Sequence, residues 1–125
     1  RIYIAFEYDP DKVGFFERAK FNMIKMIHGA YPPTGAINYI WASSAPEGRV
    51  VPNAYTERVK MIVVESGRER TNTWVSESRN ILEDYKAAFG EEPPMIRGIA
   101  IMTDSDNTGD STVTYYGDIV MKSSD

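Results

Sequence analysis

Residues 111–121, STVTYYGDIVM, carry the clearest two-residue alternation of the chain and decide the fold that the sequence predicts. Every second position holds an apolar residue or a glycine, namely Val113, Tyr115, Gly117, Ile119 and Met121. Successive side chains of a strand point to opposite faces of a sheet, so this row would enter a core while Asp118 stays outside. The stretch therefore predicts a final strand that lines the interior of a sandwich.

Six further segments are rich in β-branched and aromatic residues and predict extended chain: 1–8, 36–43, 49–55, 58–65, 72–78 and 95–102. Pro52 restricts the third of them to an edge strand or a loop. Two helices are also indicated, but the strand–helix–strand repeat of a doubly wound sheet is absent from the sequence. The predicted fold is mostly β (α+β), an antiparallel jelly-roll-type β-sandwich with two packed helices.

The first helix is expected to begin with Asp9 as its N-cap and Pro10 at its first position, and to run to about His28 before Gly29. Its apolar stripe comprises Phe16, Ala19, Met23, Met26 and Ile27, widened by Val13 and Ile24. This stripe is the surface by which the helix would pack on the sandwich.

The second helix is expected to begin after Asn80, with Glu83 in the capping-box position, and to end at Gly90. Its predicted buried face comprises Ile81, Tyr85, Ala88 and Phe89. The 125 residues suit one domain, residues 1–125. Because RIYIAF is strand-like from Arg1, whereas chain ends are usually exposed, we expect a chain truncated at its N-terminus, the C-terminal part of a longer protein.

The composition excludes several classes of function. A net charge of −4 argues against a nucleic-acid surface, and no apolar run is long enough for a membrane span. Cysteine is absent, which excludes disulfides, thiolate metal sites and cysteine nucleophiles. The single histidine, His28, stands in the last turn of the first predicted helix, where a cation suits the helix dipole, and no multi-histidine metal site can form within one chain.

The acidic loop before the last predicted strand has two readings. Asp104, Asp106 and Thr108 stand at alternate positions before Gly109, like the first half of an EF-hand loop, although position twelve is Tyr115 rather than a glutamate. They could bind Ca²⁺ if distant oxygens complete the shell. The alternative, which the pattern favours, is a loop between strands whose aspartates and Asn107 bond the local backbone.

Two further features are candidates for a ligand site. Trp74 lies among serine, asparagine, glutamate and arginine and predicts an exposed ring, whereas Trp41 is predicted in the core. Glu77 and Arg79 stand two apart, so they are expected on the same side of the chain. They would form a structural ion pair to the second helix, the favoured interpretation, or an arginine oriented by Glu77 to hold a carboxylate or a vicinal diol.

Three stretches, NYIWASSAPEGRVVPNAYTERVKMIVVESG (38–67), WVSESRNILEDYKAAFGEEPP (74–94) and IRGIAIMTDSDNTGDSTVTYYGDI (96–119), resemble a bacterial family known only as a domain of unknown function. The resemblance implies a longer protein with an export signal, placed in the periplasm or outside the cell. The ending YYGDI is also similar to the last strand of jelly-roll carbohydrate-binding and galactose-binding-like domains.

The sequence thus favours a non-catalytic binding module, with a carbohydrate as its ligand, over an enzyme. The expected ligand-binding residues are Trp74, Glu77, Arg79, Asn80, Asp104, Asp106, Asn107 and Asp118. The alternatives are a polysaccharide-acting hydrolase or lyase that uses paired carboxylates, drawn from Glu7, Asp9, Glu77, Asp104 and Asp118, and an envelope protein-interaction domain with an apolar patch. A dimer through an exposed sheet edge is expected if leading strands are missing.

Overall fold

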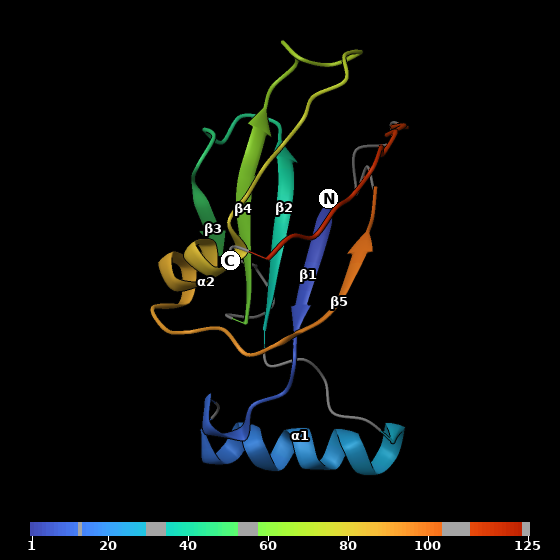
Figure 1. The fold of residues 1–125 in the computed structure, drawn as a ribbon. Coiled ribbons are helices and arrows are strands. Elements are labelled where there is room, and N and C mark those ends of the chain that lie inside the picture. Colours follow the sequence, from blue (N-terminus) through green and yellow to red (C-terminus); the bar gives the residue numbers. More distant parts are fainter. Residues whose placement is uncertain (13, 30–34, 53–57, 104–110, 124–125) are drawn as a thin grey trace.

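A computed structural model describes residues 1–12, 14–29, 35–52, 58–103 and 111–123 of the chain (Figure 1). The elements in chain order are β1 (Ile2–Phe6), the 3₁₀ turn η1 (Pro10–Lys12), α1 (Phe15–His28), β2 (Ala36–Ala42), β3 (Val50–Pro52), β4 (Val59–Ser66), α2 (Ile81–Phe89) and β5 (Ile96–Ile101). The strands predicted around residues 1–8, 36–43, 58–65 and 95–102 are confirmed, and the segment with Pro52 is the predicted edge strand.

The strands that the structure describes form one five-stranded sheet in the order β3-β4-β2-β1-β5. β1 pairs antiparallel with both β2 and β5, and β3 pairs antiparallel with β4, but β2 and β4 run parallel. The protein is therefore a mixed α+β structure with a mixed sheet and two helices, and the antiparallel jelly-roll-type β-sandwich is not confirmed. β2 and β4 are parallel neighbours because β3, the strand between them in sequence, lies on the outer edge of β4 and not between the two.

The core lies between one face of this sheet and α2. Its buried cluster comprises Ile4, Phe6, Ile37, Tyr39, Ile62 and Tyr85, flanked by the partly buried Ile2, Val64, Ile81 and Phe89. Phe6 contacts the ring of Tyr85 edge-on at a centroid distance of 4.7 Å, and Tyr85 stacks on Phe89 at 4.5 Å. Ile4 and Phe6 of β1 thus face this core, and the contacts place Tyr85 of α2 in it as predicted.

The predicted final strand is wrong, and so is the strand predicted over residues 72–78, because neither segment is part of the sheet. Val113 and Tyr115, expected in the core, are 75% and 79% exposed. The residue that anchors the segment comes from the other row: the Tyr116 hydroxyl donates to the carbonyl oxygen of Met102 at 2.9 Å and lies 3.0 Å from Thr103 Oγ1. A side-chain hydroxyl, rather than a ladder of backbone hydrogen bonds, holds the segment near the ends of β1 and β5.

The first helix differs from its prediction in its start and its orientation. Asp9 caps the turn η1 by accepting from the backbone N–H of Asp11 at 3.0 Å, and the N-cap of α1 is Gly14, whereas the end at Gly29, with φ of 80°, is as predicted. α1 lies across the end of the sheet (Figure 1). The five main residues of its predicted packing stripe are exposed rather than buried, Ile24 is partly buried, and Val13 lies outside the described residues. The buried side of α1 is instead that of Phe21.

Candidate functional site

The segment between Trp74 and α2 carries most of the predicted site residues that the structure describes. It is extended but unpaired with any strand, and its side chains hold it to the fold instead. Glu77 bonds to Glu65 of β4, and Arg79 bonds to Asp84 of α2. Glu77 and Arg79 thus tie the segment to two different elements, β4 and α2.

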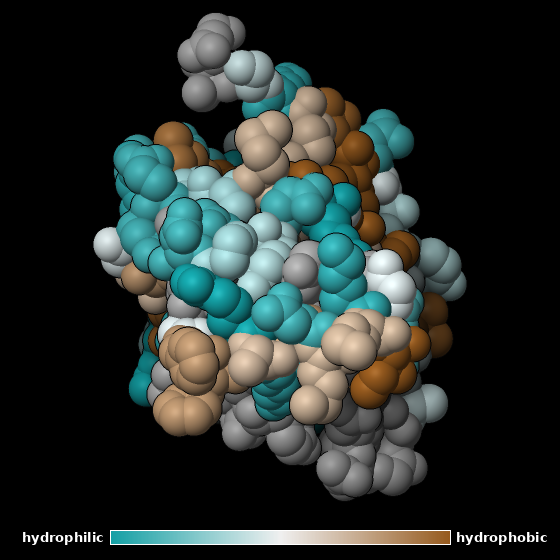
Figure 2. Space-filling view, turned by 90° about the horizontal axis from the view of Figure 1, so that it is seen from below, coloured by the Kyte–Doolittle hydropathy of each residue, from teal (hydrophilic) through white to brown (hydrophobic). Residues whose placement is uncertain are grey.

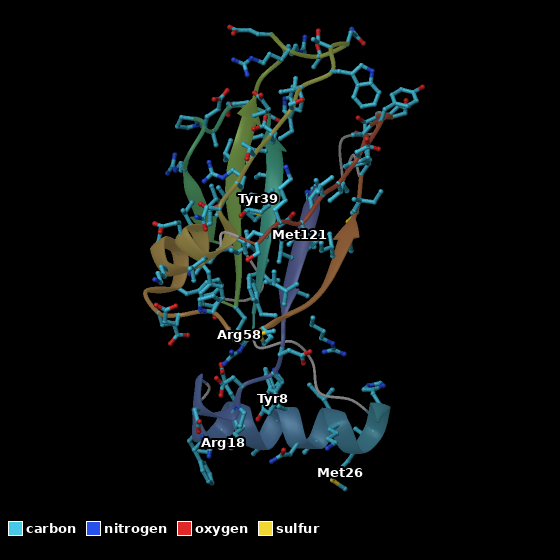
Figure 3. The ribbon with its side chains drawn as sticks, in the orientation of Figure 1. Tyr8, Arg18, Met26, Tyr39, Arg58 and Met121 are labelled. Carbon is cyan, nitrogen blue, oxygen red and sulfur yellow. The ribbon has the colours of Figure 1, made fainter. Side chains whose placement is uncertain are left out.

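Arg79 is held by a buried carboxylate at the start of α2. Its Nε donates to Asp84 Oδ2 at 3.0 Å and its Nη2 donates to Oδ1 at 2.7 Å, a bidentate pair. The hydroxyl of Tyr39, which is labelled in Figure 3, donates to the same Oδ2 at 2.6 Å. Burial, together with the Asp84 carboxylate, raises the pKa of Tyr39 well above its usual value, so this hydroxyl stays protonated. The geometry is that of the structural ion pair to the second helix which the sequence favours.

A second carboxylate cluster lies near the end of β4. Glu65 is only 2% exposed, and its Oε1 accepts a hydrogen bond from Nη1 of Arg70 at 2.8 Å. A hydrogen bond also links the carboxyl groups of Glu65 and Glu77, and it lowers the pKa of Glu65. Removal of water from the Glu77 carboxyl, this hydrogen bond and the negative charges of Glu65 and Glu47 raise the pKa of Glu77 to about 7. Glu77 therefore holds the shared proton at pH values below about 7.

Replacing Glu77 with glutamine is expected to remove a loss of stability that the protein shows as the pH rises. Because the pKa of Glu77 is raised from 4.5 to about 7, the folded state keeps a proton that the unfolded state releases, and stability falls as the pH rises through that window. Glutamine donates to Glu65 at every pH. The variant should be more stable at pH 8 by about 1 kcal/mol, a small value because Glu77 is exposed and solvent screens its charge.

Urea denaturation at pH 5 and pH 8 measures this effect. The variant and the wild type should differ little at pH 5, where Glu77 is protonated, and should separate at pH 8. Glu83→Gln is the matched control, since Glu83 is an exposed glutamate outside the pair. Equal pH profiles for wild type and Glu77→Gln would mean that the two carboxyl groups share no proton in solution.

Trp74 is the most exposed tryptophan of the chain. Its ring is 72% exposed, and one edge lies against the backbone of Gly117, where a Cβ atom would stand 3.5 Å from the ring. Tyr115 is 79% exposed, and Asp118, next to Gly117, is exposed as well. We call the Trp74 surface the ring of Trp74 together with Tyr115 and Asp118, the exposed residues near Gly117 in sequence. Trp41, predicted in the core, is 43% exposed, because its Nε1 donates outside the core to the carbonyl oxygen of Gly67 at 2.8 Å.

Asn80 and the residues of the acidic loop, also predicted to bind the ligand, are not part of the Trp74 surface in the described residues. Asn80 is the N-cap of α2, as predicted, and its Oδ1 accepts from the backbone N–H of Glu83 at 3.1 Å. Asp104, Asp106, Asn107 and Thr108, and with them the Ca²⁺ prediction, lie outside the described residues. Among the residues that are described, no group of three acidic or histidine side chains could hold a metal ion.

The sequence prediction missed Glu65, Asp84 and Tyr39 as the partners that hold the segment. One available signal was the charge of Glu65 directly after the apolar run Met61–Val64, where a carboxylate at the end of a buried strand needs a partner. The other was the position of Asp84 in the first turn of α2, near Arg79 in sequence.

The fold and these contacts define a mixed α+β protein whose five-stranded sheet carries one packed helix and an extended segment held by side chains. Residues 1–120 match the family described as "Protein of unknown function (DUF3047)", and the chain belongs to that family. This confirms the predicted membership of an uncharacterised family. No curated protein and no solved structure is significantly similar to the chain. None of the helices in the described residues is long and apolar enough to cross a membrane.

Proposed function

We propose that this protein is a non-catalytic binding module whose ligand is a carbohydrate, and that the Trp74 surface binds it. The observation that carries the proposal is the exposure of the Trp74 ring, 72%. Tryptophan is usually well covered in folded proteins, and an exposed ring beside fixed polar groups is typical of a ligand surface.

The surroundings of Trp74 support a sugar as the ligand. Gly117 holds one edge of the ring and adds no side chain that would cover it. The apolar face of a sugar ring can stack on an indole, and the exposed carboxylate of Asp118 would accept hydrogen bonds from hydroxyl groups. Arg79 and Asn80 have structural partners, so they would contribute by positioning the segment that carries Trp74.

Replacing Trp74 with alanine is expected to weaken carbohydrate binding by about tenfold or more, because the stacking surface disappears. Affinity gel electrophoresis over a panel of bacterial polysaccharides, followed by calorimetry on the best ligand, measures the effect. Trp41→Phe is the matched control, since it alters the other tryptophan and removes only its hydrogen bond to Gly67. Unchanged binding by the Trp74 variant, at unchanged thermal stability, would refute the proposal.

The alternative of a hydrolase or lyase with paired carboxylates has less support. Glu65 and Glu77 are a carboxyl pair, and Glu77 has a raised pKa as a general acid would. Glycosidases, however, place their two carboxyl groups about 5–9.5 Å apart, with the sugar between them. Here the two groups bond directly to each other, and Glu65 is buried and paired with Arg70. This geometry suits a structural contact better than catalysis.

The proposed setting is the periplasm or the space outside the cell, where polysaccharides are available as ligands. The proposal includes a dimer formed through a sheet edge, and β5 is the edge that would form it. All six residues of β5 are exposed, and β1 is its partner within the described sheet. Light scattering that shows a monomer at every protein concentration would remove the dimer from the proposal.

A further inference from the structure

Helix α1 presents a continuous apolar surface to solvent. Phe15, Phe16, Ala19, Met23, Met26 and Ile27 stand at helical positions that share one side, an arc of roughly 120°. All six are exposed, Phe16 by 85% and Met26 by 87%. We call these residues the α1 stripe. Seen from below the sheet, tan and brown side chains form a row with hydrophilic residues along one side (Figure 2).

Among the described residues, the contacts that attach the helix to the fold do not involve the α1 stripe. The attachment is on the opposite side, where the ring of Phe21 lies 5.0 Å from that of Tyr8 and the Arg58 guanidinium stands 5.1 Å above it. Glu17 forms an ion pair with the same arginine. Figure 3 shows Met26 on the side of α1 that points away from the sheet, and Tyr8 on the side toward it. The stripe is thus free to bury its apolar surface elsewhere.

The charge of α1 differs in sign from that of the rest of the chain. Of the 14 basic residues, Arg18, Lys20 and Lys25 lie in α1, but of the 18 acidic residues only Glu17 does. The helix therefore has a formal charge of +2, while the other 11 basic and 17 acidic residues give −6. In a helical projection Lys20 borders one side of the stripe, and Arg18 and Lys25 stand beyond the other. Cations thus flank the apolar arc on both sides.

We propose that α1 binds the surface of an anionic lipid bilayer and lies in the plane of its interface. An apolar stripe flanked by lysine and arginine on a helix that is not apolar all round is the pattern of such interfacial helices. The phenylalanines, methionines and Ile27 would enter the boundary between headgroups and acyl chains. The flanking cations would lie at the phosphate groups, whose negative potential attracts basic side chains.

The charges favour a lipid surface over a second copy of the chain. A two-fold contact between two α1 stripes would bring the flanking cations of one helix next to those of the other. The one carboxylate of the helix, Glu17, already pairs with Arg58 and is turned toward the body of the protein. Phosphate groups, in contrast, neutralise the same cations.

Sedimentation of the 125-residue chain with lipid vesicles tests the inference. The chain should bind vesicles of phosphatidylcholine mixed with phosphatidylglycerol, and far more weakly vesicles of phosphatidylcholine alone. Added salt should weaken the binding. Lys20→Ala should weaken it about fivefold, the contribution of one basic residue near an anionic surface.

The double variant Phe16→Glu/Met26→Glu should lose vesicle binding while it keeps the circular dichroism spectrum and the thermal stability of the wild type. Val113→Glu is the matched control, because Val113 is an exposed apolar residue in the C-terminal segment and its variant should bind as wild type does. Equal binding to both kinds of vesicle, or no binding to either, would overturn the inference. So would self-association without lipid that the double variant abolishes, since α1 would then be an interface between copies.

Discussion

Replacing Asp84 with alanine is expected to lower the free energy of unfolding by about 3 kcal/mol. Asp84 is 9% exposed, and its carboxylate accepts three hydrogen bonds, two from Arg79 and one from Tyr39. Arg79 can turn to water when its partner is lost, because its side chain is 39% exposed. The hydroxyl of Tyr39 is buried and would keep its donor unpaired, which accounts for much of the expected cost.

A double-mutant cycle between Arg79→Ala and Asp84→Ala measures the coupling. Once Asp84 is absent, removing Arg79 should cost little, so the two effects should add to clearly more than the effect of the double variant. The Asp84 variant should also be cleaved faster by a protease within residues 70–79, because the pair anchors this segment to α2. A loss of stability below 1 kcal/mol with unchanged proteolysis would show that the pair does not anchor the segment.

Local patterns predicted the elements whose determinants are local. Asn80 caps α2 by accepting from the backbone N–H of Glu83, and Gly90 ends the helix as a left-handed residue, both as predicted. The strand-forming residues in 1–8 and 58–65 likewise predicted β1 and β4, each of which has a neighbouring strand on both sides in the sheet. In these segments, propensity, capping and burial indicate the same structure.

The final strand shows what alternation alone cannot determine. A two-residue pattern specifies two faces, but a strand also needs a partner edge and a covering layer, and both depend on distant parts of the chain. The segment from Val113 to Met121 has the pattern without the pairing, and Tyr116 from its other row makes the contact that holds it. The same limit applies to α1, whose stripe was visible in the sequence although its orientation was not.

The candidate site was predicted in part for a similar reason. The spacing of Glu77 and Arg79 indicated a shared side, but their partners lie on β4 and α2. Glu65 stands beside Trp41 in the sheet because the register between β2 and β4 shifts after Ile40. A β-bulge of this kind changes the face of the sheet to which later side chains point. No sequence pattern near Glu65 predicts the bulge. The exposure of Trp74, in contrast, was predictable from its polar neighbours in sequence alone.

The same substitution is expected to have opposite consequences at two phenylalanines. Phe6→Ala should lower the free energy of unfolding by about 4 kcal/mol, because Phe6 is fully buried and the change leaves a cavity beneath α2. Its ring also loses the edge contact with Tyr85 at 4.7 Å. Phe16→Ala should change stability by only about 0.5 kcal/mol or less, because the ring of Phe16 is 85% exposed on the α1 stripe.

Guanidinium denaturation of both variants beside the wild type gives the comparison directly. Phe6→Leu, which keeps most of the volume, should lose about 1 kcal/mol and separates cavity formation from a general intolerance of change in β1. If Phe16→Ala destabilises as strongly as Phe6→Ala, the first helix packs its stripe on the fold in solution, and the surface that the vesicle experiment requires does not exist. If only Phe6 matters, the stability of the chain resides between the sheet and α2, which leaves α1 available for binding.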